Sequence, residues 1–213
     1  MRPTLETIQL PGLTPYAPML DLQRKRHAEV AQSQAPNTLY LLEHAPVITL
    51  GRKARPEHIL HSPEALAGMG IDRVPTDRGG DVTYHGPGQL VAYPILRLQE
   101  WTPSIGWYLR ALEEVLIQVL ARLDLEGERL QDFTGVWVRG AKVAAIGIGI
   151  RDWTTYHGIA LNIAPAMDHF RLIVPCGIQD KPVTSLAQLL EDAPSMTTVA
   201  TLFEEEFRRR FGI

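Results

Sequence analysis

The sequence predicts an α+β fold in a single domain, residues 1–213, with mixed, largely antiparallel sheets flanked by helices. Helical periodicity is confined to three segments, and the strand-like runs between them are short and often joined by glycine-bearing turns. Helices and strands do not alternate regularly along the chain, as a doubly wound parallel sheet would require. A chain of 213 residues can bury one sizeable core, and neither a repeat nor an obvious interdomain linker divides it.

Helices are expected at residues 15–34, 104–124 and about 197–211. In the second segment, apolar residues recur at helical spacing from Ile105 to Leu123. Thr102 fits the N-cap of this helix and Pro103 its first helical position. The third segment carries one apolar stripe, formed by Val199, Phe203, Phe207 and Phe211. Its charged run, residues 204–210, is expected to be a solvated, ion-paired helix face.

Strands are expected where short apolar runs are bounded by turn residues. These runs lie at residues 38–42, 46–50, 71–76, 82–85, 89–96, 135–138, 142–150 and 154–164.

Composition excludes several classes of protein. The net charge of −3 does not suit a protein held on nucleic acid by a basic surface. The longest apolar run, Val143 to Ile150, is too short to span a bilayer. The opening MRPTLETIQL contains Pro3 and Glu6 and lacks the apolar centre of a signal peptide. One cysteine allows no internal disulfide. We therefore expect a soluble, cytoplasmic protein with no nucleic-acid or membrane partner.

The densest run of special residues is RGGDVTYHGPGQLVAYP, residues 78–94. Its glycines predict turns on both sides of a short strand, which places Arg78 and His85 at opposite ends of that strand. Glycine also lets a ligand approach the backbone closely. The run is consistent with a binding site, or alternatively with a tight meander that has a surface arginine and a hydrogen-bonded histidine.

A second run, KVAAIGIGIRDWTTYHGIALNI, residues 142–163, predicts two strands joined by a turn near Arg151 and Asp152. Strand alternation puts small residues on one face, namely Ala145, Gly147 and Gly149 on the first strand and Gly158 and Ala160 on the second. Such a smooth, apolar floor could hold a linear hydrocarbon. Alternatively, a helix packs tightly on these small residues.

The third run, IVPCGIQDKPVTSL, residues 173–186, contains the only cysteine. Cys176 lies between Pro175 and Gly177, which favours an accessible turn, although a lone cysteine is commonly a small buried apolar residue. A free thiol has a pKa of about 8.5, so a reactive one needs a nearby cation or base. The candidates are Lys142, His85 and His157.

Together these runs resemble one family, the lipoyl(octanoyl) transferases (octanoyl-[acyl-carrier-protein]:protein N-octanoyltransferases, or lipoate biosynthesis protein B). The resemblance extends over roughly residues 35–190. It rests on four motifs in order: RGGDVTYHGPGQLVAYP, then GVWV followed by KVA at residues 135–144, then HGIALN at 157–162, and PCGI at 175–178.

The resemblance implies a two-step acyl transfer on the fold of the biotin and lipoate ligases. Cys176 would be the nucleophile that accepts octanoyl, or lipoyl, as a thioester, and Lys142 would be its dyad partner. The implied acyl-substrate contacts are Arg78, Gly79, Gly80, Asp81, Val82, Thr83, Tyr84, His85, Ala145, Ile146, Gly147, Gly158, Ile159 and Ala160.

The resemblance also implies the partners. The donor would be octanoyl-acyl carrier protein, which brings its own phosphopantetheine, and the acceptors would be lipoyl domains of 2-oxoacid dehydrogenase complexes and the glycine cleavage H protein. No cofactor is expected, because transfer from thioester to amide runs downhill without ATP, and the chain has no GxxxxGK[ST] loop. His58 and His61 lack an apparent third ligand, so no metal is expected either. Monomer is the default expectation.

Other functions stay open from the sequence. An ATP-dependent lipoate or biotin ligase would carry a lysine like Lys142 but need no cysteine. A cysteine hydrolase that releases free fatty acid would need an oriented histidine, for which His157 and Asn162 are the candidates. A non-catalytic acyl-binding module would not depend on Cys176.

Overall fold

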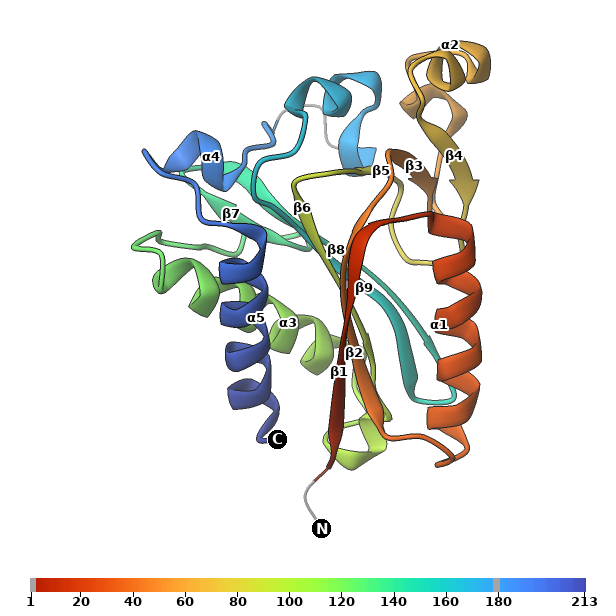
Figure 1. The fold of residues 1–213 in the computed structure, drawn as a ribbon, viewed down its shortest axis with the longest axis vertical. Helices are drawn as coiled ribbons and strands as arrows, with labels where there is room; N and C mark the ends of the chain where they lie inside the picture. The colour runs from red at the N-terminus through yellow and green to blue at the C-terminus, as the bar shows by residue number, and fades with distance from the viewer. Residues whose placement is uncertain (1–2, 178–180) are drawn as a thin grey trace.

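A computed structural model describes residues 3–177 and 181–213, except for the side chain of Cys176. Its centre is a six-stranded sheet in the order β1-β2-β6-β9-β8-β7 (Figure 1). The strands are β1 Leu5–Thr14, β2 Asn37–His44, β6 Gln89–Ile95, β7 Val136–Val138, β8 Ala141–Arg151 and β9 Thr154–Asn162. Only β1 and β2 pair in parallel, and the other neighbours in this sheet are antiparallel.

A smaller, three-stranded sheet stands beside one end of the large one (Figure 1). It consists of β3 Val47–Leu50, β4 Asp72–Pro75 and β5 Val82–His85, in the order β4-β3-β5. β3 pairs in parallel with β4 and antiparallel with β5. The short helix α2, Pro63–Gly68, contributes Leu66 to the separate apolar cluster of this sheet.

Helices cover both faces of the large sheet (Figure 1). On one face lies α1, Tyr16–Ala31, and on the other lie α3, Ile105–Ala121, and α5, Met196–Phe211. The larger apolar cluster joins α3 and α5 to the sheet, and a smaller cluster that includes Met19 and Val30 joins α1 to the opposite face. The short helix α4 spans Leu186–Leu189, and short 3₁₀ helices lie at Pro56–His58 (η1), Leu98–Glu100 (η2), Met167–Leu172 (η3) and Pro175–Gly177 (η4).

The expected α+β class, the three long helices and all eight expected strands are confirmed. The predicted start of α3 is wrong by two residues. Its N-cap is Ser104, whose hydroxyl oxygen accepts a hydrogen bond from the Trp107 amide at 3.3 Å. The hydroxyl of Ser104 satisfies an otherwise unpaired amide of the first turn, which Thr102 is too far away to do.

Strand β1 was not predicted from the sequence. Its apolar alternation is interrupted by Pro11 and Gly12, and its pairing with β2 shifts register between Gln9 and Leu13. Gly12 has a positive φ of 68°, which produces an irregularity within the strand rather than a turn that ends it.

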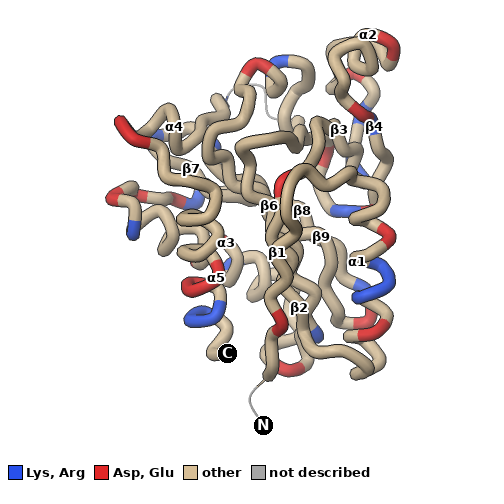
Figure 2. The backbone as a smooth tube through the Cα atoms, viewed as in Figure 1, with Lys and Arg blue, Asp and Glu red and all other residues tan. Residues whose placement is uncertain are grey.

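Charged residues lie mainly on helices and loops, whereas most of the length of the central strands is uncharged (Figure 2). The charged run of α5 is only partly solvated as expected. Arg208 and Glu204 are both partly buried and pair at 2.9 Å, and Glu206 is buried and is paired with Arg209. No helix within residues 3–177 and 181–213 is long and apolar enough to cross a membrane.

Candidate active site

A narrow pocket lies on the face of the large sheet that α1 covers. Its empty volume is about 450 Å³, a figure that includes open solvent at the mouth. It is lined by Tyr16, Arg78, Gly79, Gly80, Asp81, Thr83, His85, Tyr93, Ala145, Ile146, Gly147, His157, Gly158, Ile159 and Ala160. The structure therefore brings together all the predicted acyl-contact residues except two.

Those two residues, Val82 and Tyr84, alternate with the pocket-lining residues along β5. Their side chains point instead into the apolar cluster of the small sheet. There the Tyr84 hydroxyl lies 2.8 Å from Nδ1 of His169. They support the strand that carries Thr83 and His85 and do not line the pocket themselves.

The floor of the pocket comes from small residues paired across β8 and β9. Ala145 lies opposite Ala160, and Gly147 lies opposite Gly158, so all four share one face as predicted. Gly158 also lets β6 pack closely against β9, because a Cβ at this position would lie 2.1 Å from the carbonyl oxygen of Ala92 on β6. The helix-packing alternative is thus partly right: α1 covers this face, and the pocket remains beside its first turn.

Gly149 lies on the same face but is covered. A Cβ on Gly149 would lie 2.5 Å from the ring of Tyr156, which sits directly opposite on β9. The open part of the floor therefore ends before this residue. The turn between the two strands consists of Asp152 and Trp153, both with positive φ, one residue later than expected.

Arg78 is buried and is not the surface arginine of the alternative interpretation. Its Nη2 donates to the carbonyl oxygen of Thr49 at 2.7 Å, and its Nε donates to the Thr49 hydroxyl at 3.1 Å. The loop that carries it is fixed on two sides: the Lys53 amide donates to the Gly80 carbonyl, and the Gly79 amide donates to the carbonyl of Ile148 on β8. The glycine pair thus allows this loop to lie against the edge of the large sheet.

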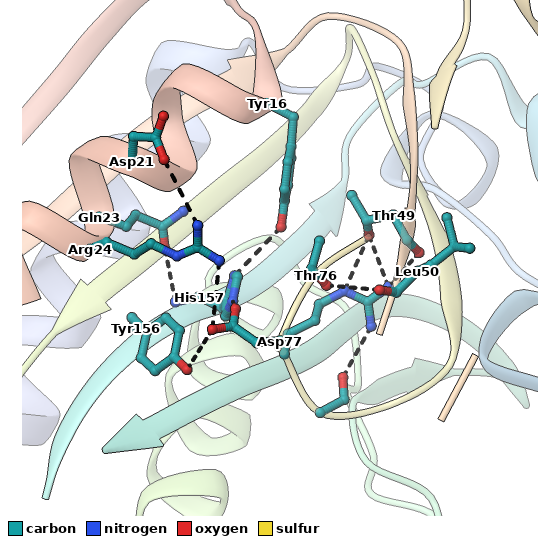
Figure 3. Close-up of polar contacts among 12 residues, drawn as sticks. Tyr16, Asp21, Gln23, Arg24, Thr49, Leu50, Thr76, Asp77, Tyr156 and His157 are labelled. Atoms are coloured by element: carbon teal, nitrogen blue, oxygen red, sulfur yellow. Dashed lines mark hydrogen bonds and ion pairs between the residues drawn. The ribbon is translucent and has the colours of Figure 1, made fainter. Parts of the chain in front are cut away.

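The inner wall of the pocket includes three residues that the sequence did not single out as substrate contacts: Tyr16, Tyr93 and His157. Nε2 of His157 donates to Asp77 at 2.9 Å, and its Nδ1 lies 3.5 Å from the Tyr16 hydroxyl (Figure 3). The amide of His157 donates to the side chain of Gln23 on α1 at 2.8 Å. These contacts tie the first turns of α1 to β9 behind the pocket.

Burial and hydrogen bonding determine which side chains of this wall, and of its partner Asp77, are charged. Burial lowers the pKa of His157, and the hydrogen bond from His157 lowers the pKa of Asp77, so a neutral imidazole faces a carboxylate. Burial raises the pKa of Tyr16 to about 12 and lowers the pKa of His85 to about 3. At neutral pH Tyr16, His85 and His157 are therefore uncharged.

Lys142 reaches the same face of the sheet through a β-bulge. Val136 on β7 opposes Ala144, but the next residue, Trp137, opposes Lys142, so β8 contains one extra residue at Val143. Without it, strict alternation would put Lys142 and Ala145 on opposite faces. Nζ of Lys142 lies 4.8 Å from the centroid of the Trp137 ring, and the side chain is largely buried.

The cysteine turn, Pro175–Gly177, packs against a histidine–aspartate pair. Nδ1 of His58 donates to Oδ2 of Asp81 at 2.6 Å. A Cβ on Gly177 would lie 2.8 Å from that oxygen and 3.1 Å from Cε1 of His58. Gly177, with a φ of 68°, is thus the residue that lets the turn approach the pair.

The structure does not test the expectation for Cys176, but it shows the partners of the histidines. The Cys176 side chain lies outside the described part, so its pairing with Lys142 stays a prediction. The described residues contain no group of three His, Cys, Asp or Glu that could hold a metal, and His58 instead pairs with Asp81. The His157–Asn162 arrangement needed for a hydrolase is not formed, because Asn162 bonds Gln89 and Thr184.

A wider, open groove meets the mouth of the pocket. The residues that line both are Gly79, Gly80, Asp81, Ile146 and Gly147. Lys142 and Gly177 also line the groove, as do the cations Arg52, Lys53 and Arg55. The groove therefore connects the mouth of the pocket with Lys142 and the cysteine turn.

An α+β domain with a pocket on its large sheet and a buried lysine beside the pocket mouth is typical of a catalytic domain that binds a small molecule. The chain belongs to the lipoyl protein ligase A/B catalytic domain family, whose model matches residues 15–208. It is 51% identical over 197 residues to a curated protein of Chloroflexus aurantiacus named octanoyltransferase, a match that covers 91% of this chain and 88% of that one.

Solved structures agree in fold. The bipartite lipoate protein ligase of Thermoplasma acidophilum, studied with its E2 lipoyl domain, has a TM-score of 0.72 at 15% identity, over 100% of this chain and 85% of that chain. The biotin protein ligase of Aquifex aeolicus, in complex with biotin and ATP, has a TM-score of 0.60 at 12% identity, over 97% and 70%. The expected biotin/lipoate ligase fold is confirmed.

Proposed function

We propose that this protein is an octanoyltransferase of lipoate biosynthesis, which transfers an octanoyl group to a specific lysine of lipoyl domains. The names of relatives about half identical to this chain support the activity. The observation that carries the proposal is the pocket over the Ala145–Ala160 and Gly147–Gly158 pairs, which opens beside Lys142 and the cysteine turn.

The pocket suits a linear acyl chain for an energetic reason. An octanoyl group has six methylenes, and burying each contributes about 0.8 kcal/mol, so complete burial contributes roughly 5 kcal/mol of binding. The small residues of the floor leave room for such a chain. A bulky, polar ring would find few unpaired polar groups here, because the side chains of Tyr93, His85 and His157 already have partners.

In the first half-reaction, the Cys176 thiolate attacks the carbonyl carbon of a thioester donor. A carbon–sulfur bond forms to Cys176, the donor's carbon–sulfur bond breaks, and the donor leaves as a thiol with the proton that Cys176 lost. In the second, an acceptor lysine amine attacks the acyl-cysteine, a carbon–nitrogen bond forms, the carbon–sulfur bond to Cys176 breaks, and the cysteine sulfur takes up the proton that the amine loses. Lys142 would carry the proton in both steps.

The donor in this proposal is octanoyl-acyl carrier protein, and the acceptors are lipoyl domains of 2-oxoacid dehydrogenases and the glycine cleavage H protein. The study of a ligase of this fold with an E2 lipoyl domain supports an acceptor of that kind. The reaction needs no ATP, since both steps are neutral or downhill, and the proposal assigns no step to a metal. We place it in the cytoplasm, where thiols stay reduced, and in a monomer.

A second candidate is an ATP-dependent ligase. It is favoured by the fold shared with a biotin ligase that binds ATP and by the cations Arg52, Lys53 and Arg55 in the groove, which could contact phosphates. Such an enzyme would activate a free acid as its adenylate, and Cys176 would have no role.

The test is the mass of an apo lipoyl domain after incubation with the protein and octanoyl-acyl carrier protein, without ATP. We expect one octanoyl group on the domain, and none on a domain whose target lysine is replaced by arginine. Modification only with free octanoate and ATP would establish the ligase instead. Free octanoate without a modified domain would establish a hydrolase.

A further inference from the structure

A chain of buried hydrogen bonds runs from the acyl pocket to the lysine strand. It begins at His85 in the pocket wall, whose Nδ1 donates to Oε1 of Gln89 at 2.7 Å. Nε2 of Gln89 donates to Oδ1 of Asn162 at 2.8 Å. Gln89 and Asn162 lie opposite each other on β6 and β9, so their amides meet directly across the sheet.

The chain continues into the backbone that holds Lys142. Nδ2 of Asn162 donates to the carbonyl oxygen of Thr184 at 2.9 Å, and the Thr184 amide donates to the carbonyl oxygen of Lys142 at 2.9 Å. The Lys142 amide in turn donates to the Pro182 carbonyl at 2.8 Å. The segment 182–184 that follows the cysteine turn is therefore fixed to Lys142 on one side and to Asn162 on the other.

From His85 to the carbonyl oxygen of Lys142, the hydrogen bonds all have the same direction. Each amide side chain accepts from the pocket side and donates toward the lysine side, so the dipoles are aligned and strengthen one another. His85, Gln89, Asn162 and Thr184 are all buried. Because these groups are buried, water could not replace a lost hydrogen-bond partner, and the unpaired group would destabilise the fold. The chain of hydrogen bonds therefore has one arrangement of low free energy.

We propose that Gln89 and Asn162 are positioning residues of the transfer reaction. They hold Lys142, and the chain that follows the cysteine turn, in fixed register with the acyl pocket. This inference rests on the proposed function only in assigning Lys142 to proton transfer. The two residues do not line the pocket or the groove, so they act through Lys142 and segment 182–184.

Two neutral variants of similar shape, Asn162→Leu and Gln89→Met, remove the hydrogen bonds without adding charge. We expect each variant to lower the rate constants of both half-reactions, and hence kcat, about 10- to 100-fold, because small displacements of catalytic groups have effects of that size. KM for the donor should change little. The double variant should lose little more than either single variant, since the chain is already broken.

A buried threonine on the same strand provides a matched control. Thr155 accepts from the Leu96 amide at 2.9 Å and donates to the Pro94 carbonyl at 2.6 Å, at the far end of β9 from Asn162. Thr155→Val removes these buried hydrogen bonds with little change in shape. It should lower the melting temperature about as much as Asn162→Leu does but leave kcat unchanged.

A second readout does not depend on octanoyl at all. Cys176 is the only thiol, so the pH profile of its alkylation reports how well a neighbouring cation stabilises the thiolate. In Asn162→Leu and Gln89→Met, the midpoint should rise by about one pH unit as Lys142 loses its position. If kcat and this midpoint both match wild type in whichever variant folds, the amide pair is purely structural and the inference is wrong. A shifted midpoint in a protein that does not transfer octanoyl would reject only the proposed function.

Discussion

Nζ of Lys142 lies 4.8 Å from the centroid of the Trp137 ring, and the two residues face each other where β7 and β8 are out of regular register. The extra residue on β8 reverses the alternation of side chains at this point. It puts Lys142 on the face of the sheet that carries Ala145 and Gly147. One bulge thus aligns the candidate proton carrier with the candidate acyl floor.

The first prediction concerns the chemistry of Lys142. Lys142→Ala should slow both acyl-enzyme formation and transfer to the acceptor, by about 10²- to 10⁴-fold, because one group handles protons in both steps. Lys142→Arg should restore little, since arginine keeps the charge but is not a base near neutral pH. Rapid mixing with octanoyl donor, followed by mass spectrometry, measures the two steps separately. Near-normal turnover of the arginine variant would mean that a positive charge at this position is enough for catalysis and that Lys142 does not transfer a proton.

The second prediction uses neighbouring residues on opposite faces of β8. Ala145→Val narrows the pocket, which should weaken octanoyl binding by about 1–3 kcal/mol. The value of kcat/KM should therefore fall for octanoyl donors and fall less for butanoyl donors. Ala144→Val makes the same change in the core beneath α3 and α5, where it should lower the melting temperature and leave the chain-length ratio unchanged. If both variants behave alike, Ala145 does not face an acyl slot.

Ala145 is a cleaner site for this test than Gly147. A Cβ on Gly147 would lie 3.2 Å from both Cδ of Arg78 and the carbonyl oxygen of Gly79. A valine there would push against the loop as well as fill the pocket, and the two effects on activity could not be separated.

The third prediction concerns the cysteine turn. Gly177→Ala adds a methyl group 2.8 Å from the Asp81 carboxylate, at a backbone conformation that side chains disfavour. The turn must move away from the His58–Asp81 pair, so transfer should fall about 10- to 100-fold. Gly68→Ala, on α2 with open space around it, should leave activity unchanged. Equal kinetics of the two variants would show that the turn has no fixed position in catalysis.

The fourth prediction is a loss of stability in mild acid. Burial lowers the pKa of His44 to about 4 and of His85 to about 3, whereas both return to about 6.5 on unfolding. Between these values the unfolded chain binds more protons than the folded one, so stability is complete above about pH 6.5 and falls as the pH decreases. At pH 5 each histidine should cost about 2 kcal/mol. The hydrogen-bonded Asp77, with its lowered pKa, adds a further loss only below about pH 4.

Urea unfolding at pH 7.5, 6.0 and 5.0 measures this slope. His44→Gln removes one titrating group and keeps an amide that can pair with the Thr14 carbonyl or the Tyr93 hydroxyl. Its stability should therefore depend less steeply on pH than that of wild type. An identical slope in the two proteins would exclude His44 as a source of the acid sensitivity.

Much of the fold follows from the sequence because its periodicity is strong and local. The apolar stripes of α3 and α5 and the short runs of β2 to β9 each identify an element within a few residues. Strand β1 was missed because Pro11 and Gly12 resemble the end of a strand, although tertiary pairing with β2 carries it past them. The bulge at Val143 has no sequence signal, since it is defined only by the partner strand β7.

The candidate site was predictable where its residues lie in compact motifs. Twelve of the fourteen positions that the family resemblance implies, in runs around Arg78, Gly147 and Gly158, line the pocket. Tyr16 was not predicted, because it lies far from the motifs in the sequence and reaches the pocket only through the docking of α1. The partnership of His58 with Asp81 likewise joins two segments that no local pattern connects.

The most direct test of the central claim is the intact mass of the protein after exposure to octanoyl-acyl carrier protein without ATP or acceptor. The account predicts a single octanoyl adduct that hydroxylamine releases and that maps to Cys176, the only cysteine. Cys176→Ala should show none. An adduct that persists in Cys176→Ala, or wild-type protein that transfers octanoyl without ever forming one, would contradict transfer through a cysteine thioester.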